Sequence, residues 1–165
     1  MMDPSPILTA PVILKVHLVA AVAGILLGPL AIYRTRRDVI HRIVGRTWVC
    51  AMAVLALTGL LIPASVLPIA GPFGPIHLFS LWTLLTLWRG VTAIRRGDVV
   101  AHSAEMRSLY LQGICIAGLL TILPGRTLNA VFFADAPWLG AGIALGIGML
   151  AATRILLQTK GFRQR

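Results

Sequence analysis

The chain has 165 residues, of which 58% are hydrophobic and only 12% are charged, and its formal net charge at pH 7 is +10. Because soluble globular domains carry about 25% charged residues, this composition excludes an ordinary soluble domain. The basic residues gather between long uncharged stretches, a distribution typical of membrane topology, so no nucleic-acid partner is expected.

Five uncharged stretches predict an all-α integral membrane protein with five transmembrane helices, because about 20 apolar residues cross a bilayer. The first helix is expected to begin at Pro11, where the missing N–H costs nothing, and Asp38 and Asp98 are the expected N-caps of the second and fourth. Clustered Pro and Gly predict the turns between helices. The five expected helices cover residues 11–33, 38–67, 75–94, 98–125 and 137–159.

The distribution of Lys and Arg predicts an orientation in the membrane. The basic side chains follow the first, third and fifth expected helices, and only Lys15 and Arg126 lie on the other side. Since Lys and Arg accumulate on the cytoplasmic side, this bias predicts an outer N-terminus and a cytoplasmic C-terminus. The basic inner face is also expected to attract anionic head groups of the lipid bilayer.

The two halves of the chain carry matching segments. A-I-Y-R-T-R-R-D-V-I-H over residues 31–41 is similar to A-I-R-R-G-D-V-V-A-H over 93–102, and a His-Leu pair precedes each of them. The match predicts a four-helix core made of two parallel helical-hairpin repeats, plus one extra helix. The repeats and the extra helix are expected over residues 11–67, 72–125 and 137–159 of one membrane domain covering residues 1–165.

All four histidines belong to this repeat. His17 and His77 are equivalent and are expected near the outer face, whereas His41 and His102 are equivalent and are expected near the inner face. Ionisable side chains at membrane depth are costly and tend to be functional. A pseudo-two-fold axis would place the imidazoles of each pair opposite one another, as in haem iron held by two histidines. The pattern predicts two b-type haems and transmembrane electron transfer, with a quinone or a small reductant as partner.

Haem propionates need cations, and the planar guanidinium of Arg binds carboxylates well. At the inner face, the candidates are Arg42, Arg46 and Arg107, with Arg89 beside them. At the outer face, the candidate is Arg126. Membrane topology explains the inner arginines equally well, whereas Arg126 runs against the positive-inside bias.

Two other functions fit the same histidines. They would be interfacial groups in a non-catalytic accessory or assembly subunit, or proton-binding groups in a small proton-coupled transporter, because histidine titrates near neutral pH. The sequence contains no Gly-rich phosphate loop, no paired carboxylates and no Ser/His/Asp set, so a hydrolase is not expected. Whether the chain is an enzyme stays open, and a haem-b membrane oxidoreductase is the expected class if it is.

Several segments resemble a bacterial family of predicted membrane proteins of unknown function. They are G-P-L-A-I…H-R-I-V-G-R-T-W-V-x-A-M over residues 28–52, H-L…L-T-L-W-R-G-V-T-A-I-R-R-G-D over 77–98, H-x-x-x-M-R-S-L-Y over 102–110 and T-I-L-P-G-R over 121–126. The resemblance implies a bacterial source, and hence the inner (cytoplasmic) membrane, but it brings no activity with it.

The order of the histidines also resembles the architecture of the ascorbate-dependent transmembrane di-haem cytochrome b family. In that family, the first and third core helices hold one haem and the second and fourth hold the other. Here His17 with His77, and His41 with His102, alternate in the same way. The substrate-binding segments of that family are not evident in this sequence, so the resemblance implies a cofactor arrangement without naming an electron donor or acceptor.

Overall fold

The computed structural model describes residues 5–64, 68–113, 116, 118–147 and 149. These residues are helical almost throughout, and the only β-structure among them is an isolated bridge between Ala70 and Phe73. The all-α prediction is therefore confirmed. The chain divides into two compact units, Thr9–Ala117 and a second unit that joins Met1–Leu8 to Gly118–Arg165.

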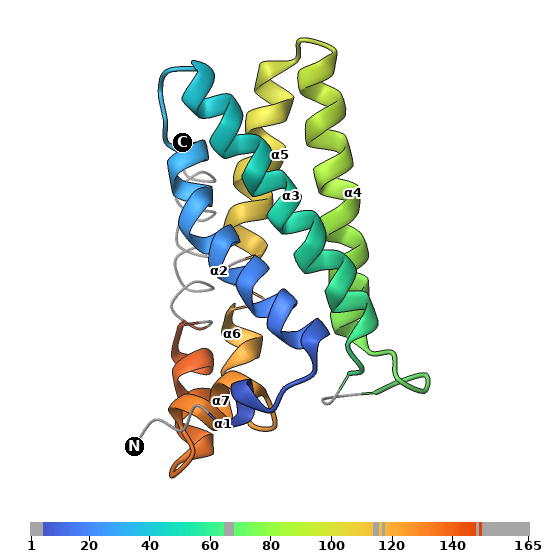
Figure 1. Cartoon of the computed structure of the whole chain (residues 1–165), viewed down its shortest axis with the longest axis vertical. Helices are drawn as coiled ribbons and strands as arrows, with labels where there is room; N and C mark the ends of the chain where they lie inside the picture. Colours follow the sequence, from blue (N-terminus) through green and yellow to red (C-terminus); the bar gives the residue numbers. More distant parts are fainter. Residues whose placement is uncertain (1–4, 65–67, 114–115, 117, 148, 150–165) are drawn as a thin grey trace, which may run out of the picture. The chain divides into compact units, whose positions relative to one another are not determined.

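Four long helices build the Thr9–Ala117 unit (Figure 1). They are α2 (Val12–Ile32), α3 (Val39–Leu61), α4 (Pro75–Arg95) and α5 (Val99–Gln112). Each helix packs against its neighbour in the chain, and α2 also contacts α5. This last contact closes the four helices into a bundle in which successive helices run in opposite directions.

The helix starts follow the signals read from the sequence. Pro11 is the N-cap of α2, and Pro75 is the first residue of α4. The Asp38 carboxylate accepts a hydrogen bond from the backbone N–H of His41 in α3. In the same way, the Asp98 carboxylate accepts one from the backbone N–H of Ala101 in α5. These carboxylates satisfy N–H groups that the first turn of a helix leaves unpaired, so both aspartates are N-caps as predicted.

The fourth helix was expected to reach residue 125. Among the described residues, α5 ends at Gln112 in the first unit, and the short α6 (Gly118–Thr121) lies in the second. The segment expected as an outer loop contains α7 (Thr127–Phe132), which begins after a turn at Gly125 with φ of +83°.

Two further segments of this unit are α1 (Ser5–Leu8) and the apolar helix Pro137–Ile147. The latter is the beginning of the predicted fifth helix. The rest of that prediction, up to residue 159, lies almost entirely outside the described residues.

Two helices, α2 and α3, are long and apolar enough to cross a membrane. Helix α4 is as long as α2 but carries polar side chains on its buried face. Its buried polar residues are His77, Ser80, Thr83 and Thr86, and its exposed apolar residues include Leu78, Leu81, Leu85 and Trp88. Apolar side chains outside and polar side chains inside are typical of a helix that lies in lipid rather than in water.

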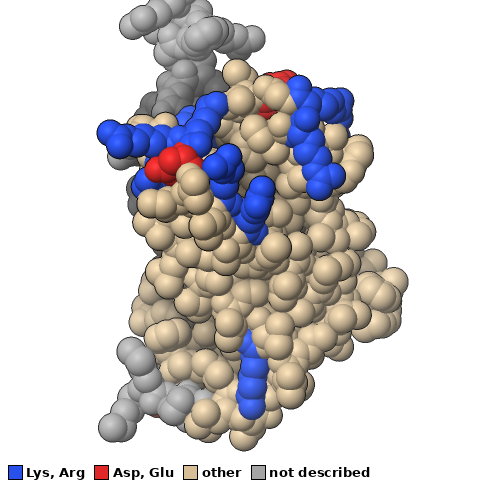
Figure 2. All heavy atoms as spheres, turned by 45° about the horizontal axis from the view of Figure 1, so that its top comes forward, with Lys and Arg blue, Asp and Glu red and all other residues tan. Residues whose placement is uncertain are grey.

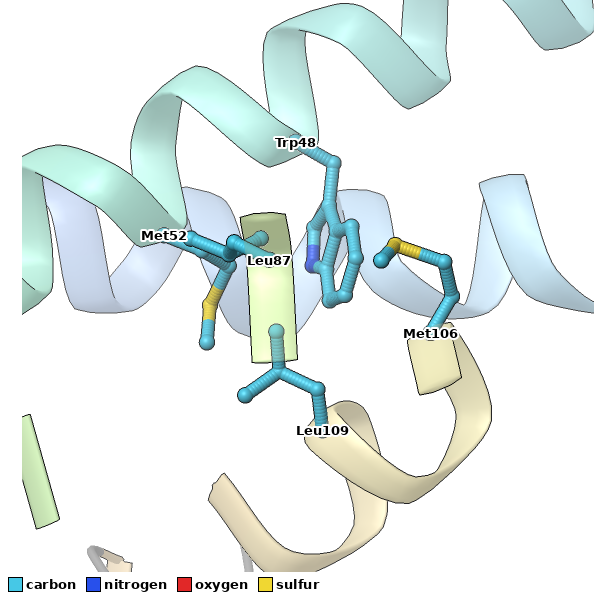
Figure 3. Close-up of a cluster of buried hydrophobic side chains, with 5 residues drawn as sticks. All are labelled: Trp48, Met52, Leu87, Met106 and Leu109. Carbon is cyan, nitrogen blue, oxygen red and sulfur yellow. The ribbon is translucent and has the colours of Figure 1, made fainter. Parts of the chain in front are cut away.

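A cluster of apolar side chains fills the middle of the bundle (Figure 3). It consists of Trp48, Met52, Leu87, Met106 and Leu109. The Trp48 side chain is 1% exposed, and its indole N–H donates a hydrogen bond of 3.0 Å to the backbone carbonyl of Gly24 on α2. A helix carbonyl is accessible in this way because glycine has no side chain to cover it.

Candidate cofactor site at the two ends of the bundle

The histidines lie at opposite ends of the four-helix bundle. His17 and His77 are near the starts of α2 and α4, whereas His41 and His102 are in the first turns of α3 and α5. Because successive helices run in opposite directions, the starts of α2 and α4 share one end and those of α3 and α5 share the other (Figure 1). At 1.5 Å per residue, His77 and the turn of α4 that contacts His102 are about 20 Å apart along the helix.

The His17 ring is oriented by a hydrogen bond to α3. Its Nδ1 lies 2.9 Å from Oγ1 of Thr58, and that hydroxyl lies 2.7 Å from the backbone carbonyl of Val54. A carbonyl oxygen can only accept, so the Thr58 hydroxyl donates to Val54 and accepts from Nδ1–H of His17. In the neutral ring, Nε2 then carries no proton and its lone pair is available to a ligand.

The His77 ring is 4% exposed and has one nitrogen without a partner. Its Nδ1 lies 3.1 Å from the backbone N–H of Gly74 and 3.3 Å from the carbonyl of the same residue. Nδ1 therefore has a partner in either tautomer. When it accepts from the N–H of Gly74, the proton of the neutral ring is on Nε2; when it donates to the carbonyl of Gly74, Nε2 is a bare acceptor. Nε2 is buried and has no hydrogen-bond partner among the described residues. The ring edge of Phe73 covers His77 at 5.0 Å between centroids.

His17 meets α4 across a glycine of α3. A Cβ atom on Gly59 would lie 2.8 Å from Oγ of Ser80 and 3.4 Å from Cε1 of His17, so both side chains occupy the space that glycine leaves open. Ser80 is one helical turn beyond His77 on the same buried face of α4. The structure therefore brings His17 to the His77 end of the bundle, with His17 level with Ser80.

The two histidines at the other end have different surroundings. Nδ1 of His102 lies 2.9 Å from the backbone carbonyl of Gly90, so it donates there and leaves Nε2 bare. Nδ1 of His41 is buried and lacks a hydrogen-bond partner among the described residues. No contact between the two rings is recorded. The described part of the chain also contains no group of three His, Cys, Asp or Glu side chains that would suit a metal ion.

Basic side chains surround this second end, as Figure 2 shows. They lie at the ends of α2 and α4, at the starts of α3 and α5, and in the connections between them. They are Arg34, Arg36, Arg37, Arg42, Arg46, Arg89, Arg95, Arg96 and Arg107. Arg34 donates from Nε to the Asp38 carboxylate at 3.0 Å, and this bond holds the pKa of Asp38 well below its usual range and raises that of Arg34. Lys15 is at the opposite end of the same unit.

The predicted propionate partners fall into three places. Arg42 and Arg46 are exposed on the first turns of α3, close in sequence to His41. Arg107 is exposed on α5 and lines a hollow beside Tyr33. No contact between any of these guanidinium groups and a histidine ring is recorded among the described residues.

Arg126 belongs to the second unit, where it is the N-cap residue of α7. Its side chain is partly buried, its Nε has no hydrogen-bond partner among the described residues, and burial lowers its pKa. The neighbouring Asn129 is buried and donates to the carbonyls of Ile122 and Pro137 at 2.7 and 2.9 Å. These bonds hold the backbone on both sides of α7 together.

Sequence reasoning missed Thr58, Gly59 and Ser80, which contact or orient His17. A signal for Ser80 exists, because His77, Ser80, Thr83 and Thr86 follow one another at intervals of three residues and so share a helix face. No comparable periodicity marks Thr58, whose position opposite His17 depends on how α2 and α3 pack.

No curated protein and no solved structure matches the chain, so the resemblance to the di-haem cytochrome b architecture stays a prediction. A match exists to the family DUF2306, described as a predicted membrane protein, and it covers residues 14–156. This match includes all four histidines, both hairpins and the start of the helix that follows them. The chain therefore belongs to the DUF2306 family of membrane proteins, whose function is unknown.

Proposed function

We propose that this protein carries electrons across a membrane through two haem b groups, one held by His17 and His77 and the other by His41 and His102. One observation carries the proposal. In each pair, one histidine has its Nδ1 bonded to an oxygen, which leaves Nε2 bare, and the other has a buried ring nitrogen without a partner.

The buried nitrogens without a partner among the described residues, Nδ1 of His41 and Nε2 of His77, are the atoms for which a ligand is expected. Leaving a buried polar group unsatisfied costs about 1–3 kcal/mol, so native structures rarely contain one without a functional reason. Coordination of iron would satisfy the lone pair of Nδ1 in His41, and that of Nε2 in His77 in the tautomer whose Nδ1–H donates to the carbonyl of Gly74. Histidines that bind metals usually donate their other N–H to an oxygen, as His17 and His102 do here.

Haem would supply the one-electron chemistry, and the chain would supply its position and surroundings. Thr58 fixes the tautomer of His17, and the carbonyl of Gly90 fixes that of His102. The cluster around Trp48 lies between the two histidine levels along α3, α4 and α5 and keeps water out of the middle of the bundle. Arg42 and Arg46, on the first turns of α3 beside His41, are the proposed partners of the propionates at that end of the bundle.

The proposal includes a membrane topology of five spans. The apolar outer faces of α2 and α3, and the polar inner face of α4, support lipid around the bundle. The basic end of the bundle is then cytoplasmic, with the N-terminus outside and the C-terminus inside a bacterial inner membrane. A quinone or a small reductant would supply or accept the electrons.

The test is the visible spectrum of the purified protein. We expect two low-spin haems b per chain in the reduced-minus-oxidised difference spectrum of protein purified from haem-replete cells. His17→Ala and His77→Ala should each remove the same haem, and His41→Ala and His102→Ala should each remove the other. Thr86→Val removes a buried hydroxyl of α4 from between the two levels, and this matched control should retain both haems.

A colourless wild-type protein would contradict the proposal and leave two other functions. Uptake of a solute into proteoliposomes, driven by a proton gradient and lost in His77→Ala, would then indicate a proton-coupled transporter. Copurification with a stable partner, without uptake, would indicate an accessory or assembly subunit.

A further inference from the structure

A hollow of about 290 Å³ lies between the end of α2 and the second half of α5, at the basic end of the bundle. It is lined by Ile32, Tyr33, Arg107, Tyr110 and Leu111. We propose that it binds the phosphodiester head group of an anionic phospholipid. The proposal rests on the lining of this hollow and not on haem, and it assigns Arg107 to a lipid phosphate rather than to a haem propionate.

The chemistry of the lining selects an anion. Arg107 offers several N–H donors and a permanent positive charge, and Tyr33 offers a phenolic O–H. No carboxylate is among the described side chains that line the hollow. Charge-assisted hydrogen bonds from a guanidinium to phosphate oxygens are among the strongest that a protein makes at a surface.

A second hollow at the same end of the bundle gives a contrast. It has about 240 Å³ and lies between α4 and α5, where Arg89 and Arg96 are accompanied by the carboxylates of Asp98 and Glu105. Positive and negative groups line it together, so its field does not favour an anion. The two hollows are similar in size and position but differ in charge, and only the first suits an anionic head group.

The walls of the first hollow are fixed by contacts inside the bundle. The Tyr110 ring packs against Gly28, whose missing side chain leaves room for it, and its hydroxyl donates to the carbonyl of Ile25 at 3.4 Å. Tyr33 is the C-cap residue of α2, and its backbone N–H is bonded to the carbonyl of Pro29. The side chains that would meet the head group therefore extend from the end of α2 and from the second half of α5.

Apolar side chains of the same hollow suit the part of a lipid below its phosphate. Ile32 and Leu111 line the hollow, and Leu111 is 53% exposed. Tyrosine is enriched where a membrane meets water, because its ring is apolar and its hydroxyl is polar. A phosphate beside Arg107 and Tyr33, with glycerol and acyl carbons against Ile32 and Leu111, matches both parts of the lining.

The experiment counts bound lipids on the detergent-purified full chain by native mass spectrometry, during titration with phosphatidylglycerol or phosphatidylcholine. The test variants are Arg107→Gln and Tyr33→Phe. The control is Arg95→Gln, which removes the same charge from the same end of the bundle but lines neither hollow. Thermal unfolding of each variant is measured in the same detergent.

We expect one phosphatidylglycerol to be retained preferentially over phosphatidylcholine. Arg107→Gln should weaken its binding about tenfold, and Arg95→Gln no more than about twofold, because a direct charge-assisted bond is lost only in the first. Tyr33→Phe should weaken it less than Arg107→Gln does. Equal losses in Arg107→Gln and Arg95→Gln would overturn the proposal in favour of diffuse attraction to the basic end.

Two further arms separate other ligands. Inorganic phosphate that displaces the lipid completely, with the same dependence on Arg107, would overturn the lipid assignment in favour of a free anion. A short-chain quinone that displaces phosphatidylglycerol from wild type but not from Arg107→Gln would overturn it in favour of a quinone site. If Arg107→Gln unfolds at a lower temperature, Arg107→Lys keeps the charge and should retain the preference for phosphatidylglycerol with weaker binding.

Discussion

Replacing Gly59 by alanine tests whether the pair of His17 and His77 depends on close approach of α3 and α4. The added methyl group would lie 2.8 Å from Oγ of Ser80 and 3.4 Å from Cε1 of His17. Contacts between non-bonded heavy atoms are favourable at about 3.5–4.0 Å, so Ser80 or the helix that carries it has to move. Gly45 lies on the same helix and is the matched control, because a methyl group there would have no neighbour within 4 Å.

Two effects of opposite sign decide the magnitude. Exchange of glycine for alanine inside a helix stabilises by about 1 kcal/mol, and this gain applies at both positions. Overpacking of a filled site costs about 1–3 kcal/mol, and this cost applies only at Gly59. Gly45→Ala should therefore be more stable than wild type, and Gly59→Ala should be less stable than Gly45→Ala by about 1–3 kcal/mol.

The assay is equilibrium unfolding in detergent, followed by tryptophan fluorescence, with haem content measured on the same samples. The double variant Gly59→Ala/Ser80→Ala removes the closest atom and should regain most of the lost stability, which a double-mutant cycle reports as coupling. Under the proposed function, Gly59→Ala should also deplete the haem bound by His17 and His77. Equal stability of Gly59→Ala and Gly45→Ala, with no coupling to Ser80, would show that α3 and α4 are not in contact at this level.

Three further perturbations address other parts of the bundle. Asp38→Asn should retain the N-cap but lose the ion pair with Arg34. Because the ion pair lowers the pKa of Asp38, wild type should have the higher Tm above about pH 4. This difference in Tm should vanish as the pH falls and Asp38 becomes protonated. Thr58→Val should free the His17 ring at nearly constant volume. Under the proposed function, the haem bound by His17 and His77 should then broaden or shift its α-band while the other haem is unchanged; identical spectra would exclude Thr58 as the group that orients the ring. Trp48→Phe should destabilise by about 2 kcal/mol, from the smaller ring and from the lost bond of the indole N–H, measured by chemical unfolding followed by circular dichroism; a loss below about 0.5 kcal/mol would place that bond outside the stable core.

The fold was predictable where a local rule decides it. Asp38 and Asp98 are N-caps as expected, because their carboxylates satisfy N–H groups within the next turn and need no tertiary contact. The short helix α7 was not predictable in this way. Its segment was expected to be an outer loop, and the buried Asn129, which donates to the carbonyls of Ile122 and Pro137, depends on packing that the sequence does not encode locally.

The candidate site was predictable to a similar degree. The repeat placed His17 with His77 and His41 with His102 at matching ends, and the structure has the members of each pair at the same end of one bundle. Their hydrogen-bond partners were not predictable, because Thr58 meets His17 through the packing of two helices. Two rings also differ from a symmetric expectation. The His77 ring accepts a hydrogen bond from the backbone N–H of Gly74 at its own helix start, whereas His17 reaches across to α3.

This asymmetry bears on how the histidines should be interpreted. A purely structural histidine satisfies both ring nitrogens, or leaves the second one in water. His77 does neither, since Nδ1 is already bonded to Gly74 and the buried Nε2 has no hydrogen-bond partner among the described residues. Under the proposed function, haem iron would be the partner of this nitrogen.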